Sequence, residues 1–159
     1  MSTRIVFVCT GNRARSQMAE GLARALVRDG VEIASAGSRP DVRGVHPLAI
    51  EVLREKGIDA GGHYSKKIEA LEGEFDYVIT LCDDAAQDCP NFAARRERIH
   101  WGMPDPAVAL NQGVAPLQVF RDSRDEIERR LRPWLAEKGL LRESRGEAER
   151  RRAGTSRHA

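Results

Sequence analysis

The chain has 159 residues, of which 41% are hydrophobic and 31% are charged. This length and balance predict one compact globular domain and argue against a disordered chain. No apolar run approaches the roughly 20 residues that a membrane-spanning helix needs, so no membrane partner is expected. The first residues lead directly into a strand without a signal-peptide pattern, which predicts a cytoplasmic protein. The three cysteines, an odd number, exclude a fully paired disulfide framework of the secreted type.

The formal net charge of +2 comes from the C-terminal end of the sequence. Residues 142–159 hold six Arg and three Glu, so the rest of the chain has a formal charge of −1. This end has almost no apolar side chains with which to bury a face. We therefore expect a domain at residues 1–140, followed by a basic, flexible tail at residues 141–159 that aids solubility. The body has no basic stripe, and no nucleic-acid partner is expected.

The predicted elements alternate between strands and helices along the chain. Strands are expected at residues 4–9, 31–36, 75–81 and 98–101, helices at 16–29, 47–56 and 120–137, and a short helix at 68–71. The first strand is apolar on both faces, as central parallel strands are. The alternation predicts an α/β fold, a three-layer sandwich with a central four-stranded parallel sheet.

The first and last helices carry expectations for single residues. Ser16 is a good N-cap for the first helix. The predicted apolar stripe of that helix is Met18, Leu22, Ala25 and Leu26. Pro133 lies inside the last helix, where proline removes a backbone hydrogen bond, so we expect it to bend or end that helix.

The loop after the first strand carries the strongest chemical signal. It reads Cys9-Thr10-Gly11-Asn12-Arg13-Ala14-Arg15-Ser16 and joins an apolar strand to a helix. Such a loop can wrap around a tetrahedral oxyanion, with its backbone N–H groups pointing inward at a helix N-terminus. Arg15 adds a charged, bidentate fork, and the positive field, with a hydrogen bond from Ser16, favours the nucleophilic thiolate of Cys9. The alternative is a buried cysteine beside an unrelated surface arginine.

A second pair of cysteines follows the third strand. Cys82 and Cys89 are separated by six residues, enough to close a disulfide loop if the segment rearranges. The acidic and small residues between them are typical of a solvated, mobile stretch. Two alternatives stay open: the thiols pack in the core, or they bind zinc together with His63 or His100, although their spacing does not suit zinc.

A third motif surrounds Asp105. Residues 100–106 read His-Trp-Gly-Met-Pro-Asp-Pro, so this carboxyl group lies in a loop between two prolines. A carboxyl group held in such a loop is suited to act as the general acid for a leaving oxygen. The alternative is an Asp that forms a turn and takes no part in chemistry.

Together these motifs resemble a known superfamily. The Cys-x5-Arg-Ser loop on the first strand–helix turn is similar to the signature of the low-molecular-weight protein tyrosine phosphatases, which implies their flavodoxin-like topology. Ala107 stands where those phosphatases place an aromatic residue, and Ala14 where they often have a second loop cysteine. The wider pattern resembles the thioredoxin-coupled arsenate reductases of this superfamily: CTGN-x-x-RSQMAEG at residues 9–21, SAG at 35–37, TLC-x6-CP at 80–90 and HWG-x-x-DP at 100–106.

This resemblance implies that the protein reduces arsenate to arsenite for arsenic detoxification. Cys9 would attack arsenic while Asp105 protonates the departing hydroxide. Cys82 would then attack the Cys9 sulfur and release arsenite, and Cys89 would move the disulfide to Cys82–Cys89, which thioredoxin reduces. Phosphate and sulfate are expected to compete with arsenate. No metal and no organic cofactor is expected, and a monomer is predicted.

Support for the loop is also implied by the resemblance. Some family members bind potassium there through residues that match Asn12, Glu20 and Ser35, plus an Asp, but Lys66 lies in the segment that would supply this Asp. We expect the Lys66 ammonium to replace the cation, interact with Glu20 and orient Asn12, with Ser16 also supporting the loop. The alternative is that Lys66 lies in solvent.

Two other functions stay open on the sequence alone. A low-molecular-weight protein tyrosine phosphatase would hydrolyse the Cys9 adduct instead of passing it to a second thiol. A non-enzymatic module that binds oxyanions or regulates a partner would keep its function after alkylation of Cys9.

Overall fold

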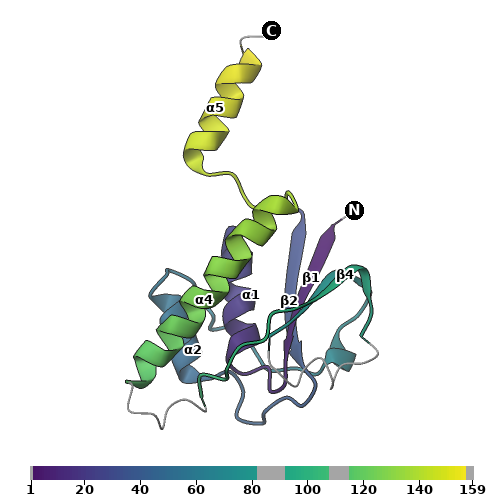
Figure 1. The fold of residues 1–159 in the computed structure, drawn as a ribbon, viewed down its shortest axis with the longest axis vertical. Coiled ribbons are helices and arrows are strands. Elements are labelled where there is room, and N and C mark those ends of the chain that lie inside the picture. The colour runs from purple at the N-terminus through teal and green to yellow at the C-terminus, as the bar shows by residue number, and fades with distance from the viewer. Residues whose placement is uncertain (1, 82–91, 108–114, 157–159) are drawn as a thin grey trace.

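The computed structural model describes residues 2–81, 92–107 and 115–156. Within these ranges one parallel sheet is formed by β1 (Thr3–Cys9), β2 (Val31–Gly37), β3 (Phe75–Thr80) and β4 (Ala94–His100). The order across the sheet is β2-β1-β3-β4, so the chain extends the sheet first on one side of β1 and then on the other (Figure 1). The predicted α/β fold with a central four-stranded parallel sheet is confirmed.

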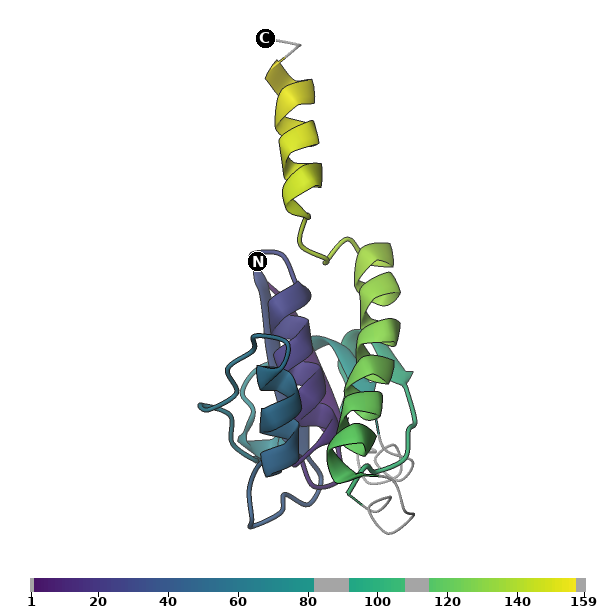
Figure 2. The ribbon, with the colours of Figure 1, turned by 90° about the vertical axis from the view of Figure 1, so that its left-hand side faces the viewer.

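Helices cover one face of this sheet. The helices α1 (Arg15–Leu26), α2 (Pro47–Arg54) and α4 (Pro116–Glu137) pack together there, as Figures 1 and 2 show. The short 3-10 helix η1 (Ile68–Ala70) buries Ile68 against the opposite face. Within the described ranges, every helix is too short or too polar to cross a membrane.

Burial on both faces fixes β1 in the centre of the sheet. Ile5 and Phe7 pack in the cluster beneath the three helices, whereas Val6 and Val8 pack in the cluster on the opposite face. This explains why the first strand is a continuous apolar run. Cys9 ends β1 at the carboxyl edge of the sheet, where the strand order reverses between β1 and β3. Doubly wound folds bind their ligands at such a position.

Two single-residue expectations for α1 are wrong. The N-cap residue is Ala14, and Ser16 lies inside the helix with its hydroxyl beside the Cys9 sulfur. Ala25, expected in the apolar stripe, is exposed. Its side chain is rotated by about 100° from Leu26, which faces the core, and this rotation turns it toward solvent.

Two later elements begin before their predicted positions. β4 begins at Ala94 instead of residue 98. The prediction missed its first residues because this edge strand exposes a run of Arg and Glu side chains, which a hydropathy pattern does not mark as a strand. α4 begins with Pro116 in its first turn, where the missing N–H costs nothing. The same helix continues through Pro133 to Glu137, the predicted last residue, so Pro133 does not end it, and a bend at Pro133 stays a prediction. Pro133 is exposed, so its ring meets solvent and not a packed neighbour.

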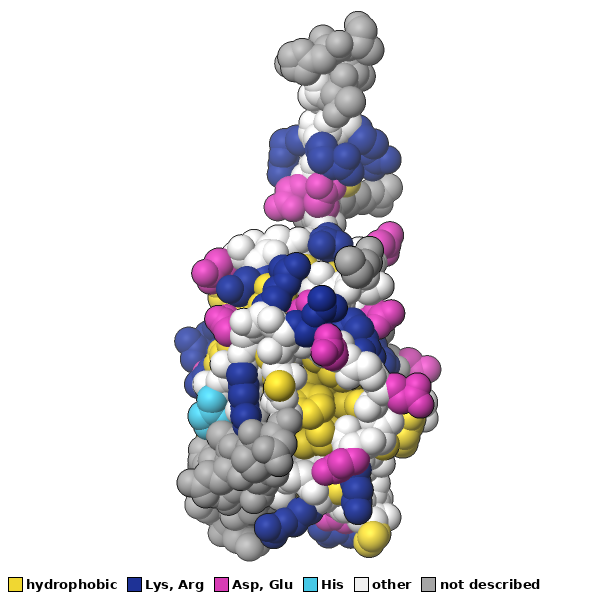
Figure 3. Space-filling view, turned by 90° about the vertical axis from the view of Figure 1, so that its right-hand side faces the viewer, with side chains coloured by type: hydrophobic (Ala, Val, Ile, Leu, Met, Phe, Trp, Pro, Cys, Tyr) yellow, Lys and Arg dark blue, Asp and Glu magenta, His cyan; other side chains and the backbone are white. Residues whose placement is uncertain are grey.

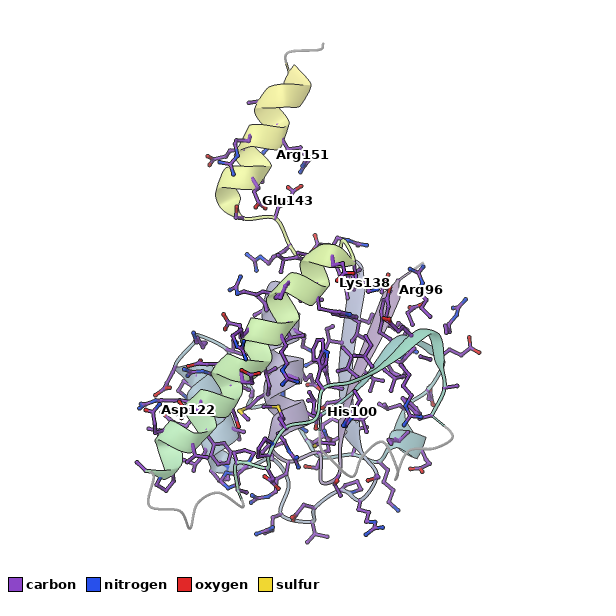
Figure 4. All side chains as sticks on the ribbon, viewed as in Figure 1. Arg96, His100, Asp122, Lys138, Glu143 and Arg151 are labelled. Atoms are coloured by element: carbon purple, nitrogen blue, oxygen red, sulfur yellow. The ribbon has the colours of Figure 1, made fainter. Side chains whose placement is uncertain are left out.

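The C-terminal segment contains a helix, α5 (Arg145–Ser156), that stands off the body in Figures 1 and 2. On the side seen in Figure 3, Lys and Arg side chains gather on this helix above a group of Asp and Glu side chains. Glu143 forms a salt bridge of 2.9 Å with Arg151 at its base (Figure 4). Leu141 forms an antiparallel bridge with Val27, so contacts with the body extend past the expected boundary at residue 140. The flexibility of the tail stays a prediction.

Candidate active site

Residues 9–16 form the Cys9 loop, and neighbouring segments hold this loop through hydrogen bonds to its backbone carbonyl oxygens. The carbonyl oxygens of Cys9, Thr10, Gly11 and Arg13 accept backbone hydrogen bonds from residues 38–46, the rim segment. The carbonyl oxygen of Asn12 accepts from the side chains of Gln17 and Ser65. Because N–H and C=O of a trans peptide point in opposite directions, the N–H groups of residues 10–14 point toward the centre of the loop. This arrangement has the geometry of a backbone nest at the N-terminus of α1, which is suited to bind an anion.

The close approach of β2 to this loop requires glycine at residue 37. A Cβ atom there would lie 2.5 Å from the carbonyl oxygen of Thr10 and 2.9 Å from the amide nitrogen of Asn12. Real Cβ atoms essentially never come so close, so any larger residue would displace the loop. Gly37 therefore lets β2 and the Cys9 loop pack directly against each other.

Cys9 is buried, with 2% of its surface exposed, and its Sγ lies 2.8 Å from Ser16 Oγ. The Asn12 side-chain amide donates to the same Ser16 oxygen at 2.8 Å. Because that oxygen already accepts a hydrogen bond, its own proton is free to point at sulfur. Ser16 is therefore placed to stabilise the thiolate of Cys9, the form that acts as a nucleophile.

Asn12 joins the loop to its surroundings. It is fully buried and has a φ of 47°, in the left-handed region that Asn tolerates better than most residues. Its Nδ2 also donates to Ser35 Oγ at 3.0 Å, and its Oδ1 accepts from Gln17 Nε2 at 3.1 Å and from the Lys66 amide at 3.0 Å. These contacts fix the loop at its sharpest bend.

A buried carboxylate lies behind Asn12. Glu20 accepts a hydrogen bond of 2.8 Å from Ser35 Oγ, and its other oxygen lies 3.1 Å from Arg24 NH1 and 3.2 Å from His63 Nε2. His63 Nδ1 lies 3.1 Å from Gln17 Oε1. Burial lowers the pKa of His63, and the Glu20 carboxylate opposes that effect. Glu20 thus links α1, β2 and the segment around His63.

Lys66 contacts Glu20, as expected from the sequence. Its Nζ lies 3.7 Å from Glu20 Oε1, donates to the Tyr64 carbonyl oxygen at 3.2 Å, and lies 4.7 Å from the centre of the Tyr64 ring. Only 13% of its side chain is exposed. Burial lowers the pKa of Lys66, and Glu20 opposes that effect. The orientation of Asn12, in contrast, comes from the Lys66 backbone amide.

Arg15 connects the Cys9 loop to the loop after β4. Its NH1 donates to the Met103 carbonyl oxygen at 3.0 Å, and its NH2 lies 3.6 Å from Asp105 Oδ2. Arg15 Nε is buried and has no hydrogen-bond partner among the described residues. A guanidinium binds an oxyanion through two adjacent N–H groups, so this edge is suited to one. Asp105 Oδ1 accepts from the Ala107 amide at 2.9 Å, which orients the carboxyl group.

These groups surround a pocket of about 100 Å³. Its lining comprises Cys9, Gly11, Arg13, Ala14, Arg15, Asp41, Arg43, His46, Asp105 and Ala107. Hydrogen bonds from Arg43 hold the pKa of Asp41 well below its usual value, so the Asp41–Arg43 pair stays ionised. The pocket therefore combines a thiol, inward amides and several guanidinium groups, which is the chemistry of an anion site with a nucleophile.

Most of the predicted site residues lie together, but two lie outside the described residues. Cys82 and Cys89 fall in the gap at residues 82–91. Sequence reasoning missed the role of Gln17 and His63 in holding the loop, and it missed the rim segment. Gln17 lies within the RSQMAEG motif, so its role could have been predicted from the sequence, whereas no local signal marks the rim segment.

The family of low molecular weight phosphotyrosine protein phosphatases matches residues 4–145. The chain belongs to this family. The superfamily that the loop motif resembles is thus confirmed, and the match extends over the whole sheet and its helices. The Cys9 loop lies within the matched residues, and the structure places it at the carboxyl edge of the sheet.

Known arsenate reductases are similar to this chain over most of its length. An arsenate reductase of Halalkalibacterium halodurans is 42% identical over 131 residues, which are 82% of this chain and 93% of that protein. The structure of an arsenate reductase in the phosphate binding state is 32% identical with a TM-score of 0.69, and the match covers 85% of this chain and 98% of the other. The thioredoxin-dependent arsenate reductase Cg_ArsC1' of Corynebacterium glutamicum is 25% identical with a TM-score of 0.61, over 86% of this chain and 63% of the other.

Proposed function

We propose that this protein reduces arsenate to arsenite, with Cys9 as the nucleophile and thioredoxin as the electron donor. The observation that carries the proposal is the nest of inward backbone amides around Cys9, with Arg15 and Asp105 at its mouth. The relatives named arsenate reductase support arsenate as the oxyanion. The similarity to the thioredoxin-dependent reductase of Corynebacterium glutamicum supports thioredoxin as the donor.

The pocket favours a small inorganic anion over a phosphotyrosine. Its volume of about 100 Å³ suits a single tetrahedral oxyanion. No Phe, Tyr or Trp stands among the described lining residues, and Ala107 occupies the place of the expected aromatic residue. An aryl ring therefore has no stacking partner among these described residues. Arsenate has the shape and charge of phosphate, so phosphate and sulfate compete for the same amides. The phosphate bound to the related reductase supports this competition.

In the first step the Cys9 thiolate attacks arsenic. An S–As bond forms, one As–O bond breaks, and the departing hydroxide takes a proton from Asp105 and leaves as water. Ser16 holds the thiolate before the attack. Arg15 and the inward amides balance the negative charge of the anion throughout, because they are fixed before the anion arrives.

In the second step Cys82 attacks the Cys9 sulfur. A Cys9–Cys82 disulfide forms and the S–As bond breaks. Its electron pair moves to arsenic, which is thereby reduced from the pentavalent to the trivalent state and leaves as arsenite. Leu81, the residue before Cys82, donates to the carbonyl oxygen of Val8, the residue before Cys9. That contact places Leu81 at the edge of the sheet where Cys9 lies, which supports Cys82 as the attacking thiol.

The relay ends on a disulfide that a protein can reduce. Cys89 attacks Cys82, so the Cys9 thiolate is released and a Cys82–Cys89 disulfide remains. Reduced thioredoxin then supplies two electrons and restores both thiols. The proposal includes a monomer in the cytoplasm that needs no organic cofactor. It also includes Lys66 as a replacement for a bound cation, supported by the contact between its ammonium and Glu20.

One assay tests the function. NADPH consumption is followed with thioredoxin, thioredoxin reductase and arsenate, and the hydrolysis of an aryl phosphate is measured in parallel. We expect arsenate-dependent oxidation of NADPH that phosphate inhibits competitively, and much slower aryl phosphate hydrolysis. Fast hydrolysis without arsenate turnover would instead assign a phosphatase. Activity that survives alkylation of Cys9 would rule out both enzymes.

A further inference from the structure

His46 lies where the rim segment meets helix α2 and lines the pocket that contains Cys9. Its backbone amide donates to the Arg13 carbonyl oxygen at 2.9 Å, which ties it directly to the Cys9 loop. Its ring packs on Phe120 of α4, with centroids 4.6 Å apart and planes inclined by 36°. The imidazole is therefore held from two sides at the edge of the anion pocket.

The N-terminus of α2 selects one tautomer of this imidazole. His46 Nδ1 accepts a hydrogen bond of 3.1 Å from the Leu48 amide and so caps the helix. A nitrogen that accepts a hydrogen bond carries a lone pair, so the ring proton of the neutral imidazole resides on Nε2. No described residue accepts a hydrogen bond from Nε2. Nε2–H is thus the polar group that the ring can offer to the pocket.

The surroundings of the ring favour its neutral form. Burial is the largest influence that lowers the pKa of His46, Arg13 and Arg43 lower it further, and Asp105 opposes them. The other titratable groups that line the pocket are Cys9, Arg15 and Asp41. Protonation on Nδ1 would also set two N–H groups against each other at the start of α2. A neutral donor adds a hydrogen bond to an anion without adding another charge to a pocket rich in arginine.

We propose that His46 is an oxyanion-binding residue whose neutral Nε2–H donates a hydrogen bond to an oxygen of the tetrahedral anion in the Cys9 loop. The ligand class is any tetrahedral oxyanion of the size of phosphate. Only its identity as arsenate rests on the proposed function. The cap and the anion contact use opposite nitrogens of one ring, so two conservative substitutions separate them.

The test uses these two variants of the reduced full-length protein. In His46→Asn the amide oxygen takes the place of Nδ1 and keeps the cap, but the side chain is too short to reach the anion. In His46→Gln the amide nitrogen takes the place of Nε2 and keeps the donor, but the cap is lost. Calorimetric titration with inorganic sulfate and with phosphate measures affinity, and thermal unfolding without added anion measures stability. Val42→Ala, a change at a fully exposed residue of the same segment, is the control.

We expect His46→Asn to weaken binding of both anions about tenfold, the loss of one hydrogen bond to a charged group. His46→Gln should bind both anions within about twofold of wild type. Both variants lose the ring that packs on Phe120, so Tm should fall in both, and further in His46→Gln, which also loses the cap. The assignment is overturned if His46→Asn binds like wild type, or if His46→Gln loses as much affinity as His46→Asn. If the wild type binds sulfate through His46 but does not turn over arsenate, the proposed function fails and the His46 assignment stands.

Discussion

Asn12 is fully buried in a left-handed conformation, and each polar group of its side chain has a protein partner. A buried amide without partners would cost about 1–3 kcal/mol, so these contacts are needed for the loop to keep its shape. The same contacts leave the Ser16 proton available to the Cys9 sulfur. At the scale of residues, one hydrogen-bond network therefore both supports the Cys9 loop and stabilises the thiolate of Cys9.

The relay predicts different outcomes for two cysteine substitutions. Cys82→Ser should lower thioredoxin-dependent arsenate turnover by about a thousandfold or more, because the attacking thiol is removed. Cys9 should still react with arsenate in that variant. Cys89→Ser should stop after one event as a Cys9–Cys82 disulfide, which mass spectrometry of the peptide digest detects after one equivalent of arsenate. Wild-type turnover in either variant would refute the three-thiol relay.

At the scale of elements, two segments hold the Cys9 loop from opposite sides. The rim segment binds its carbonyl oxygens, and the segment at residues 63–66 binds Asn12 and Glu20. Glu20 is buried beside the cations Arg24 and Lys66 and the imidazole of His63, and such a carboxylate is costly to leave unpaired. The Lys66 ammonium thus helps to neutralise the negative charge of Glu20, which lies next to the Cys9 loop.

If Lys66 replaces a bound cation, arsenate turnover should be the same in potassium and in sodium at fixed ionic strength. Lys66→Met should lower the free energy of unfolding by about 1–2 kcal/mol, because Glu20 keeps Arg24 and His63 as partners. Urea unfolding measures that change, and Lys67→Met, at an exposed neighbour, should have no effect. Clear stimulation of the wild type by potassium over sodium would contradict this role of Lys66.

At the scale of the whole molecule, the parallel sheet brings three loops to one edge. The Cys9 loop follows β1, the rim segment follows β2, and the loop that contains Asp105 follows β4. Parallel strands end on the same side, so residues distant in sequence meet at one pocket. The helix α5 lies at the other end of the molecule, away from the strand ends that carry the site (Figure 1).

This distance predicts that α5 is not needed for catalysis. Deletion of residues 145–159 should leave kcat and KM for arsenate within about twofold of wild type. Exposed ion pairs such as Glu143–Arg151 contribute about 0–1 kcal/mol, so Tm should change by less than about 3 °C. Steady-state assays and thermal unfolding of the truncated and full-length proteins check both values. A large loss of turnover at unchanged Tm would assign α5 a part in catalysis or in docking thioredoxin.

The sequence alone determined the strand–helix order, the parallel sheet and the Cys9 loop with Arg15 and Ser16. These features are readable because they are local: periodicity marks each element, and the loop residues are contiguous. The starts of β4 and α4 were predicted less accurately, and each error has a physical cause. β4 is a charged edge strand, and Pro116 begins a helix in a first turn that hydropathy does not mark.

Only the tertiary structure decided which distant groups meet the loop. The contacts of Arg15 with Asp105, of Lys66 with Asn12 and of His46 with the anion pocket join residues on different elements. No local pattern encodes them, because they depend on how strands order within the sheet and on how closely β2 approaches at Gly37. The tautomer of His46 is likewise a property of the folded chain, since the start of α2 selects it.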